Sequence, residues 1–227
     1  MDAVLVSDLH LDGPGHPAQA DFLRFLGGLP PSTRLCVLGD AFQAWWHHGE
    51  APFPQYAPVA RALLDFDLVY LPGNHDFHAI GYFGARGATV PTESRPGALV
   101  SVRLGLLDAC LSHGDEADTS LGYRALHAIL RGPAFRLMVD AMSPERAWAF
   151  LHRLAGNPHG MPDASLEEVQ LSLAAARPEA LVAMGHTHGP RLLHRVEGYF
   201  VNTGDWVSHR SYATVTGDVV TLSRFDG

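Results

Sequence analysis

Lysine is absent from this chain of 227 residues, so all 16 of its basic residues are arginines. The 24 acidic residues give a formal net charge of −8, which argues against non-specific nucleic-acid binding through a broad basic surface. No segment approaches the roughly 20 apolar residues that a transmembrane helix needs. The first residues also lack the basic and apolar regions of a signal peptide, so we expect a cytoplasmic protein.

Cysteine is scarce as well. Cys36 and Cys110 each stand inside a short apolar run, which predicts two buried thiols in a reducing compartment rather than a disulfide. Charged residues make up only 18 % of the chain and apolar residues 47 %, so a large core is expected and disorder is not. The length fits a single domain over residues 1–227 that carries a sizeable insertion.

One arrangement recurs along the chain: a short apolar run ends in a small polar motif. The runs cover residues 4–6, 35–38, 68–71, 109–111, 180–184 and 199–201. Continuous rather than alternating apolar runs are typical of strands that are buried on both faces. Helical apolar spacing follows at 18–28 and 58–65, and further strands are predicted at 212–216 and 219–222. This alternation predicts an α/β fold of layers, with central β-sheets flanked by helices and a binding rim at the carboxyl ends of the strands.

Residues 116–177 differ, because helical patterns dominate there at 121–130, 134–140, 144–154 and 166–176. Ser143-Pro144 fits a helix N-cap followed by proline, and Ser165 fits the start of a capping box. The block is therefore predicted to be a helical insertion. Apolar residues at helical spacing in this block are typical of core packing, and they are also compatible with a groove that binds lipid.

The polar motifs carry imidazole, carboxylate and amide groups in a pattern that suits metal ions. Asp8 and His10 are two residues apart, so on extended backbone they point the same way and can bind one ion. The same holds for His186 and His188, although a tight turn would send each to a different ion. The whole candidate set comprises Asp8, His10, Asp40, Asn74, His113, His186 and His188.

Seven nitrogen and oxygen ligands are too many for one metal with an open position, but they suit two ions that share a bridging carboxylate. Because the set contains no thiolate, it favours divalent transition metals such as manganese, iron or zinc. Two such ions roughly 3.5–4 Å apart are a common device for in-line attack of water on phosphorus. The sequence therefore predicts a dinuclear phosphoesterase site.

The ordered motifs D-L-H, G-D, G-N-H-D, H-G-D and G-H-T-H resemble those of the calcineurin-like metallophosphoesterase family over residues 8–188. The resemblance implies two groups of ligands, which are Asp8, His10 and His188 for one metal and Asn74, His113 and His186 for the other. Asp40 would bridge the two metals. His75 would protonate the leaving oxygen or orient the scissile phosphate, and Asp76 would orient His75.

Within this family, the motifs S-D-L-H-L, G-D-A-F-Q-A-W, G-H-T-H-G-P and a late G-D-W resemble the UDP-2,3-diacylglucosamine diphosphatases of lipid A synthesis. Those enzymes use a helical insertion as a lid over acyl chains. The resemblance implies hydrolysis of UDP-2,3-diacylglucosamine to lipid X and UMP beside the inner membrane, with manganese as the expected metal. Tyr123, Arg124 and Arg153 would reach the sugar or a phosphate. His75 stands where the main branch has arginine, which leaves the substrate open.

Two alternatives stay open beside this interpretation. One is a phosphodiesterase or nucleotide pyrophosphatase that acts on a soluble substrate. The other is a non-catalytic scaffold of the same fold, which predicts lost ligands or a lost catalytic histidine, whereas all eight positions are filled here. The D-R-G continuation of protein Ser/Thr phosphatases is missing after Gly39-Asp40, which argues against that class.

Overall fold

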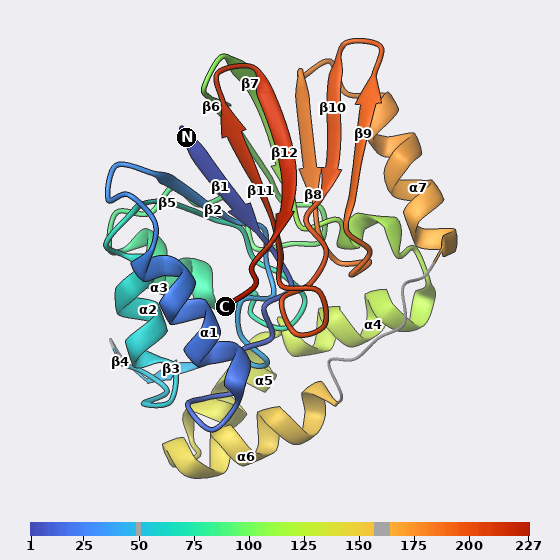
Figure 1. The fold of residues 1–227 in the computed structure, drawn as a ribbon. Helices are drawn as coiled ribbons and strands as arrows, with labels where there is room; N and C mark the ends of the chain where they lie inside the picture. The colour runs from blue at the N-terminus through green and yellow to red at the C-terminus, as the bar shows by residue number, and fades with distance from the viewer. Residues whose placement is uncertain (49–50, 157–163) are drawn as a thin grey trace.

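Two five-stranded sheets packed face to face form the centre of the molecule (Figure 1). The computed structural model describes residues 1–48, 51–156 and 164–227. The first sheet has the order β12-β11-β1-β2-β5 and comprises β1 (Ala3–Val6), β2 (Arg34–Val37), β5 (Asp67–Tyr70), β11 (Ser211–Thr216) and β12 (Val219–Arg224). The second has the order β6-β7-β8-β10-β9 and comprises β6 (Leu99–Leu104), β7 (Leu107–Ser112), β8 (Leu181–Met184), β9 (Arg191–Arg195) and β10 (Gly198–Asn202). A separate two-stranded ribbon pairs β3 (His47–His48) with β4 (Ala51–Pro52).

Three adjacent strands of each sheet run parallel, so their carboxyl ends lie at one edge. In the first sheet β1, β2 and β5 are parallel, and in the second β7, β8 and β10 are parallel. The continuous apolar runs are explained by burial on both faces: Ala3 and Leu5 pack between the sheets, while Val4 and Val6 face the helical layer. This confirms the strand burial expected from the sequence.

Helices cover the outer face of each sheet and complete the predicted α/β layers. The first sheet is covered by α1 (Pro17–Gly27), α2 (Ala57–Leu63) and α3 (Ala79–Gly84), and the second by α7 (Ala164–Ala175). Phe22 and Phe25 of α1 pack with Val4, whereas Ala174 of α7 packs with Val182 and Phe200. Both cysteines are buried and unpaired, as predicted.

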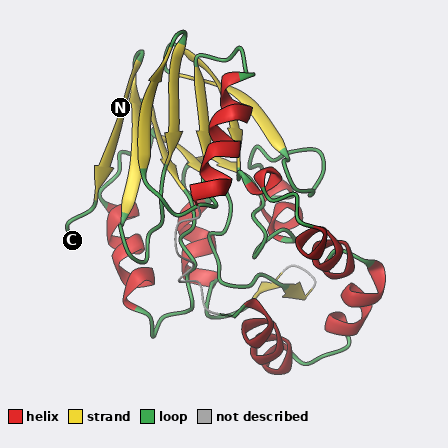
Figure 2. Ribbon diagram, turned by 90° about the vertical axis from the view of Figure 1, so that its right-hand side faces the viewer, coloured by secondary structure: helices red, strands yellow, loops and turns green. Residues whose placement is uncertain are grey.

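Three further helices, α4 (Leu121–Leu130), α5 (Pro133–Asp140) and α6 (Pro144–Ala155), lie beyond the carboxyl ends of the strands (Figures 1 and 2). They follow a short 3₁₀ turn, η1 (Asp115–Ala117). Val139 and Leu151 are buried in the same cluster as Trp46 and Phe53, so α5 and α6 pack on the main core. The predicted insertion over 116–177 thus contributes to two places, since α7 packs on the second sheet instead.

Of the two helix starts predicted within the insertion, one agrees with the structure and the other does not. Ser143 is the N-cap of α6, where its hydroxyl accepts a hydrogen bond from the Arg146 N–H at 3.4 Å. The predicted capping box at Ser165 is wrong, because α7 already begins at Ala164 and Ser165 lies within its first turn. Residues 157–163 of the insertion lie outside the described residues. None of the helices in the described ranges is long and apolar enough to cross a bilayer.

Candidate metal centre

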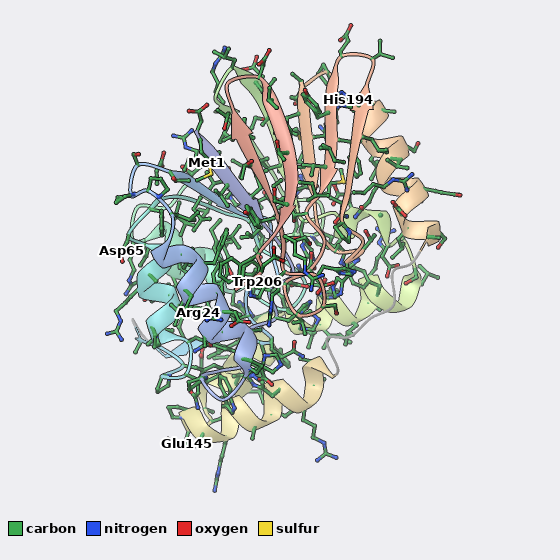
Figure 3. All side chains as sticks on the ribbon, viewed as in Figure 1. Met1, Arg24, Asp65, Glu145, His194 and Trp206 are labelled. Carbon is green, nitrogen blue, oxygen red and sulfur yellow. The ribbon has the colours of Figure 1, made fainter. Side chains whose placement is uncertain are left out.

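The loops that follow β1, β2, β5, β7 and β8 meet at the shared edge of the two sheets. Figure 3 shows side chains rich in nitrogen and oxygen gathered beside Trp206, below the ends of the strands. The main-chain N–H of Trp206 donates to the Asp8 carbonyl at 3.1 Å, which ties the late G-D-W motif to the first loop. All seven predicted ligands lie in these loops.

Five of the seven have a left-handed backbone, with φ of 51° at Asp8, 42° at His10, 52° at Asp40, 71° at His186 and 57° at His188. This conformation costs roughly 1–2 kcal/mol at a residue that carries a Cβ. Such strain persists only where the surrounding structure imposes it, and it concentrates at functional sites. The extended D-x-H segment expected from the sequence is therefore wrong in its backbone, although the two side chains still reach one place.

The first group of side chains comprises Asp8, His10 and His188. Their candidate ligand atoms all lie within 4.8 Å of one another. His10 Nε2 is 3.3 Å from His188 Nε2, and His188 Nε2 is 3.4 Å from Asp8 Oδ1. Asp8 Oδ2 accepts a hydrogen bond from the His186 N–H at 2.8 Å, whereas the buried Oδ1 accepts none.

The second group comprises Asn74, His113 and His186. Asn74 Oδ1 lies 3.2 Å from His113 Nε2 and 3.1 Å from His186 Nδ1. Asp40 lies between the two groups, with Oδ2 at 3.5 Å from His113 Nε2 and 4.0 Å from His10 Nε2. His113 Nδ1 donates to the Leu38 carbonyl at 2.8 Å, which leaves Nε2 with its lone pair toward the centre.

The donor set fits two divalent cations. Asp8 and Asp40 are buried carboxylates, and within the described ranges no arginine pairs with either. Buried carboxylates need a positive partner, and the unpaired Asp8 Oδ1 faces the imidazoles where such a partner would lie. Burial lowers the pKa of His10 to about 4, so this imidazole is neutral and its lone pair is available to a metal.

Two glycines allow the carboxylates to approach the neighbouring loops. A Cβ on Gly73 would lie 2.0 Å from Asp40 Oδ1, and a Cβ on Gly185 would lie 2.5 Å from Asp8 Oδ2. Any side chain at these positions would displace a candidate ligand. The glycines of the G-N-H-D and G-H-T-H motifs are thus explained by close approach to the two carboxylates.

His75 lies at the edge of this cluster and is oriented by the backbone. Its Nδ1 donates to the Gln43 carbonyl at 2.9 Å, and its ring stands edge-on to His10 with centroids 4.8 Å apart. The predicted orienting role of Asp76 is wrong, because no contact joins that carboxylate to the His75 ring among the residues the structure describes.

Asp76 instead organises the loops beneath the ligands. Its carboxylate accepts hydrogen bonds from the N–H groups of Gly73 and Ala41 at 2.8 and 2.7 Å, and from the Tyr70 hydroxyl at 2.5 Å. Burial, reinforced by the nearby charge of Asp40, raises the pKa of Asp76 to about 6. The residue therefore holds the G-D and G-N-H-D loops together.

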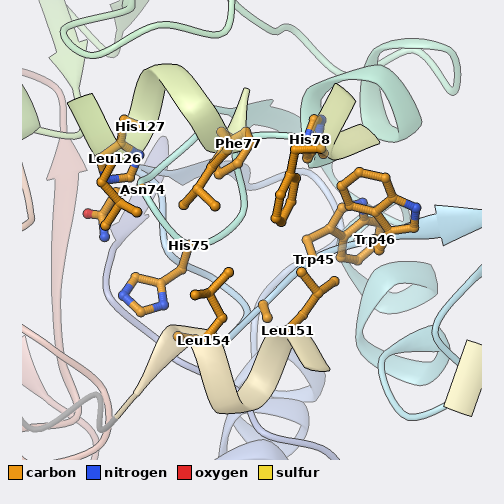
Figure 4. A pocket seen from close by; sticks show the side chains of 14 residues that line it. Trp45, Trp46, Asn74, His75, Phe77, His78, Leu126, His127, Leu151 and Leu154 are labelled. Atoms are coloured by element: carbon orange, nitrogen blue, oxygen red, sulfur yellow. The ribbon is translucent and has the colours of Figure 1, made fainter. Parts of the chain in front are cut away.

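An apolar pocket with a cavity volume of about 120 Å³ opens beside the cluster (Figure 4). Asn74 and His75 line it toward the candidate ligands, and aromatic rings and leucines line the remainder. The leucines come from the insertion, with Leu126 on α4 and Leu151 and Leu154 on α6, while Trp45, Trp46 and Phe77 come from the loops of the main domain. An apolar lining with a few polar groups at one end is the character of sites that bind amphiphilic small molecules.

Of the three predicted substrate-binding residues, the structure brings only Tyr123 to the centre. Its ring centroid is 6.2 Å from that of His186, and its hydroxyl donates to Asp115 Oδ2 at 3.0 Å. Arg124 is exposed and lines a different pocket, and Arg153 is exposed on α6 without lining the apolar pocket. The two arginines are placed on other faces of their helices.

Sequence reasoning missed His127, which appeared as one isolated histidine among several. It is only 5 % exposed, lines the apolar pocket beside Asn74, and has no hydrogen-bond partner for Nδ1. Burial lowers its pKa to about 4, so the ring is neutral. The available signal was its spacing of four residues from Tyr123, which places both rings on one helix face, with centroids 4.2 Å apart.

Residues 1–190 match the calcineurin-like phosphoesterase family, and the chain belongs to this family of dinuclear metal-dependent hydrolases. A UDP-2,3-diacylglucosamine hydrolase of Xanthomonas campestris pv. campestris is 29 % identical over an alignment of 251 residues that covers 99 % of each chain. A protein of the same name from Marinobacter nauticus is 28 % identical over 91 % of this chain and 90 % of its own length. An archaeal phosphodiesterase shares the fold, with a TM-score of 0.54 and 10 % identity over 98 % of this chain and 99 % of that chain.

Proposed function

We propose that the enzyme hydrolyses the pyrophosphate bond of UDP-2,3-diacylglucosamine and releases lipid X and UMP. The observation that carries this proposal is the apolar pocket, which begins at Asn74 and His75 of the candidate metal centre. A substrate with a phosphorus atom at the centre and an acyl chain in the pocket would occupy both. The similarity to the two UDP-2,3-diacylglucosamine hydrolases over nearly the whole chain supports the same substrate.

In this proposal the seven side chains hold two divalent cations, with manganese as the expected metal. Asp8, His10 and His188 would bind one, Asn74, His113 and His186 the other, and Asp40 both. The bound cations would supply Lewis-acid chemistry, which favours deprotonation of water and neutralises charge on the phosphoryl oxygens. The distances of 3.1 to 4.0 Å among these groups support the assignment.

His75 is proposed to donate a proton to the leaving phosphate oxygen. Its Nδ1 proton is committed to the Gln43 carbonyl, so Nε2 is the atom left to exchange a proton with substrate. The neighbouring Tyr123 and His127 face the same space from α4 and are proposed to contact the sugar or its phosphate. General acid catalysis of this kind contributes about 10²–10⁴-fold to a rate.

The insertion over 116–177 is proposed to act as a lid through α4, α5 and α6, with Leu126, Leu151 and Leu154 facing the acyl chain. Each buried methylene of that chain would contribute about 0.8 kcal/mol. We also propose that the enzyme works in the cytoplasm at the surface of the inner membrane, where such a substrate resides. The exposed leucines of α4 and α5, Leu121 and Leu137, support contact with that surface.

The test compares kcat/KM for UDP-2,3-diacylglucosamine with the values for UDP-N-acetylglucosamine and cyclic nucleotides. We expect the acylated substrate to be preferred by at least about 100-fold, because two acyl chains offer many methylenes to the pocket. Equal or better cleavage of the unacylated compounds would contradict the proposal. The enzyme would then be a phosphodiesterase for a soluble substrate, an alternative favoured by His75 in place of the expected arginine.

A further inference from the structure

Gln43 contacts the lid and the candidate acid at the same time. Its main-chain carbonyl accepts the His75 Nδ1 hydrogen bond at 2.9 Å. Its side-chain Nε2 donates to the carbonyl of Gly156, the C-cap residue of α6, at 2.9 Å. The residue is 3 % exposed, so Gln43 itself is shielded from water in both contacts.

Helix α6 also borders the apolar pocket. Leu151, Leu154 and Ala155 line the pocket from this helix, and Ala155 directly precedes Gly156. A chain that enters the pocket therefore presses on the last turn of α6, whose end is bonded to Gln43. The main-chain N–H of Gln43 is held by the Leu11 carbonyl at 3.1 Å, so the side chain is the connection of this residue to the lid.

We propose that Gln43 is a positioning residue that braces His75 against the C-terminal end of α6. The contact sets where the Gln43 carbonyl lies and thereby the direction of the imidazole. The inference rests on the acid role of His75 in the proposed function. Through this residue the lid, although remote in sequence, would affect the protonation step. The C-cap residue of α6 and the ring of His75 are both hydrogen-bonded to Gln43.

The test uses Gln43→Met, which keeps the length of the side chain and the main-chain carbonyl but cannot donate to Gly156. Gln43→Glu serves as a second variant, because it keeps the shape and replaces the donor by an acceptor. The matched control is Gln19→Met. Gln19 is also buried, at 2 % exposed, and its Nε2 donates to the Gln55 carbonyl at 3.1 Å rather than to Gly156.

The readout is kcat for aryl phosphodiesters whose leaving groups range from p-nitrophenol to phenol. We expect both Gln43 variants to lose about tenfold with phenol and less than about twofold with p-nitrophenol, because only the poor leaving group needs protonation. Metal content should be unchanged, and Gln19→Met should match the wild type. In a His75→Ala background, Gln43→Met should add no further loss.

An equal loss for all leaving groups, no loss at all, or the same pattern in Gln19→Met would overturn the inference. The outcome also separates it from the proposed function. If His75→Ala itself shows no dependence on the leaving group, the acid role fails. If His75→Ala shows that dependence and the Gln43 variants do not, only the positioning role of Gln43 fails.

Discussion

Asp40 accepts a hydrogen bond from the main-chain N–H of His75 at 2.7 Å through Oδ1, while its Oδ2 faces His113 and His10. One carboxylate therefore touches the loop that carries the candidate acid and both groups of candidate ligands. A bridging ligand has this position in a dinuclear site. It follows that a substitution of Asp40 would affect both candidate metal positions and the loop that carries His75.

We accordingly expect Asp40→Ala to lower metal content from two ions per chain to less than one and to abolish activity. The reason is that one carboxylate neutralises charge at both positions. Elemental analysis and a phosphodiester assay measure the two effects. Full activity with one ion per chain, or an unimpaired Asp40→Ala, would contradict the dinuclear site.

His75→Ala should keep both metals and lose about 10²–10⁴-fold in rate on substrates with poor leaving groups. The loss should shrink for p-nitrophenyl esters, whose leaving group needs little protonation. Steady-state kinetics with both kinds of ester check this. An equal loss for both would rule out proton donation by His75.

The candidate centre could be predicted because its ligands follow the carboxyl ends of parallel strands, where chain order alone brings them together. The left-handed backbone at Asp8 and His10 could not, because their main-chain N–H groups are held by the carbonyls of Gly39 and Asp40, contacts that exist only after folding. Sequence patterns show which residues share one face of a helix, but they do not show which part of the protein that face is turned toward. They could not show that α4 turns Tyr123 toward the centre and Arg124 away from it.

Strand β9 and helix α3 were not predicted, because their sequence patterns are weak. Strand β9 is an edge strand with one hydrogen-bonded neighbour and only partly buried side chains, so it lacks a strong apolar signal. Helix α3 contains two glycines in six residues, which weakens its helical pattern. The side chain and the carbonyl of Gln43 contact segments that are distant in sequence, and no local motif marks such a residue.

A charge placed at the pocket should impair binding of the acyl chain without changing the rate of phosphodiester hydrolysis. Leu126→Glu puts a carboxylate at the pocket wall, and because Leu126 is already 48 % exposed the fold should tolerate it. We expect kcat/KM for UDP-2,3-diacylglucosamine to fall at least about tenfold, since burial of the acyl chain would desolvate the charge. Cleavage of a small aryl phosphodiester should stay unchanged.

The control for this change is Leu137→Glu, at a residue of α5 that is 71 % exposed and does not line the pocket. In detergent it should leave both activities unchanged. If both variants impair the acylated substrate equally, the pocket is not where the acyl chain binds.

Gly73→Ala should disrupt the centre through space alone, because the new Cβ would lie 2.0 Å from Asp40 Oδ1. We expect loss of metal and a decrease of about 1–3 kcal/mol in the free energy of unfolding, the usual cost of overpacking. Gly81→Ala in α3 is the matched control, since a Cβ there meets nothing within 4 Å. It should raise stability by about 0.5–1 kcal/mol. Chemical denaturation and metal analysis distinguish the two.

Two buried histidines, His127 and His78, should each make the metal-free protein less stable as the pH falls from 6.5 toward 4. Burial lowers the pKa of His127 and of His78 to about 4 from the ordinary 6.5, so between these values the unfolded chain binds protons that the folded chain does not. The contribution of these two histidines to stability is therefore full above about pH 6.5, and each can remove about 1.4 kcal/mol per pH unit below it.

Denaturant unfolding at pH 7 and pH 5 measures this slope. His127→Leu should reduce the difference between the two values, whereas His194→Leu, at an exposed position of β9, should leave it unchanged. An unaltered difference in His127→Leu would show that other groups govern the acid sensitivity.

The pairing of β1 has a consequence for the order in which the protein can be completed during synthesis. This strand leads to Asp8 and His10, yet one of its two neighbours is β11, which spans Ser211–Thr216. The strand that delivers these ligands therefore keeps an open edge until the much later segment Ser211–Thr216 has been synthesised. A truncation at residue 190, the end of the family match, would leave that edge unpaired for good. Any shortened version of this enzyme must therefore retain its final hairpin, although that hairpin carries none of the candidate ligands.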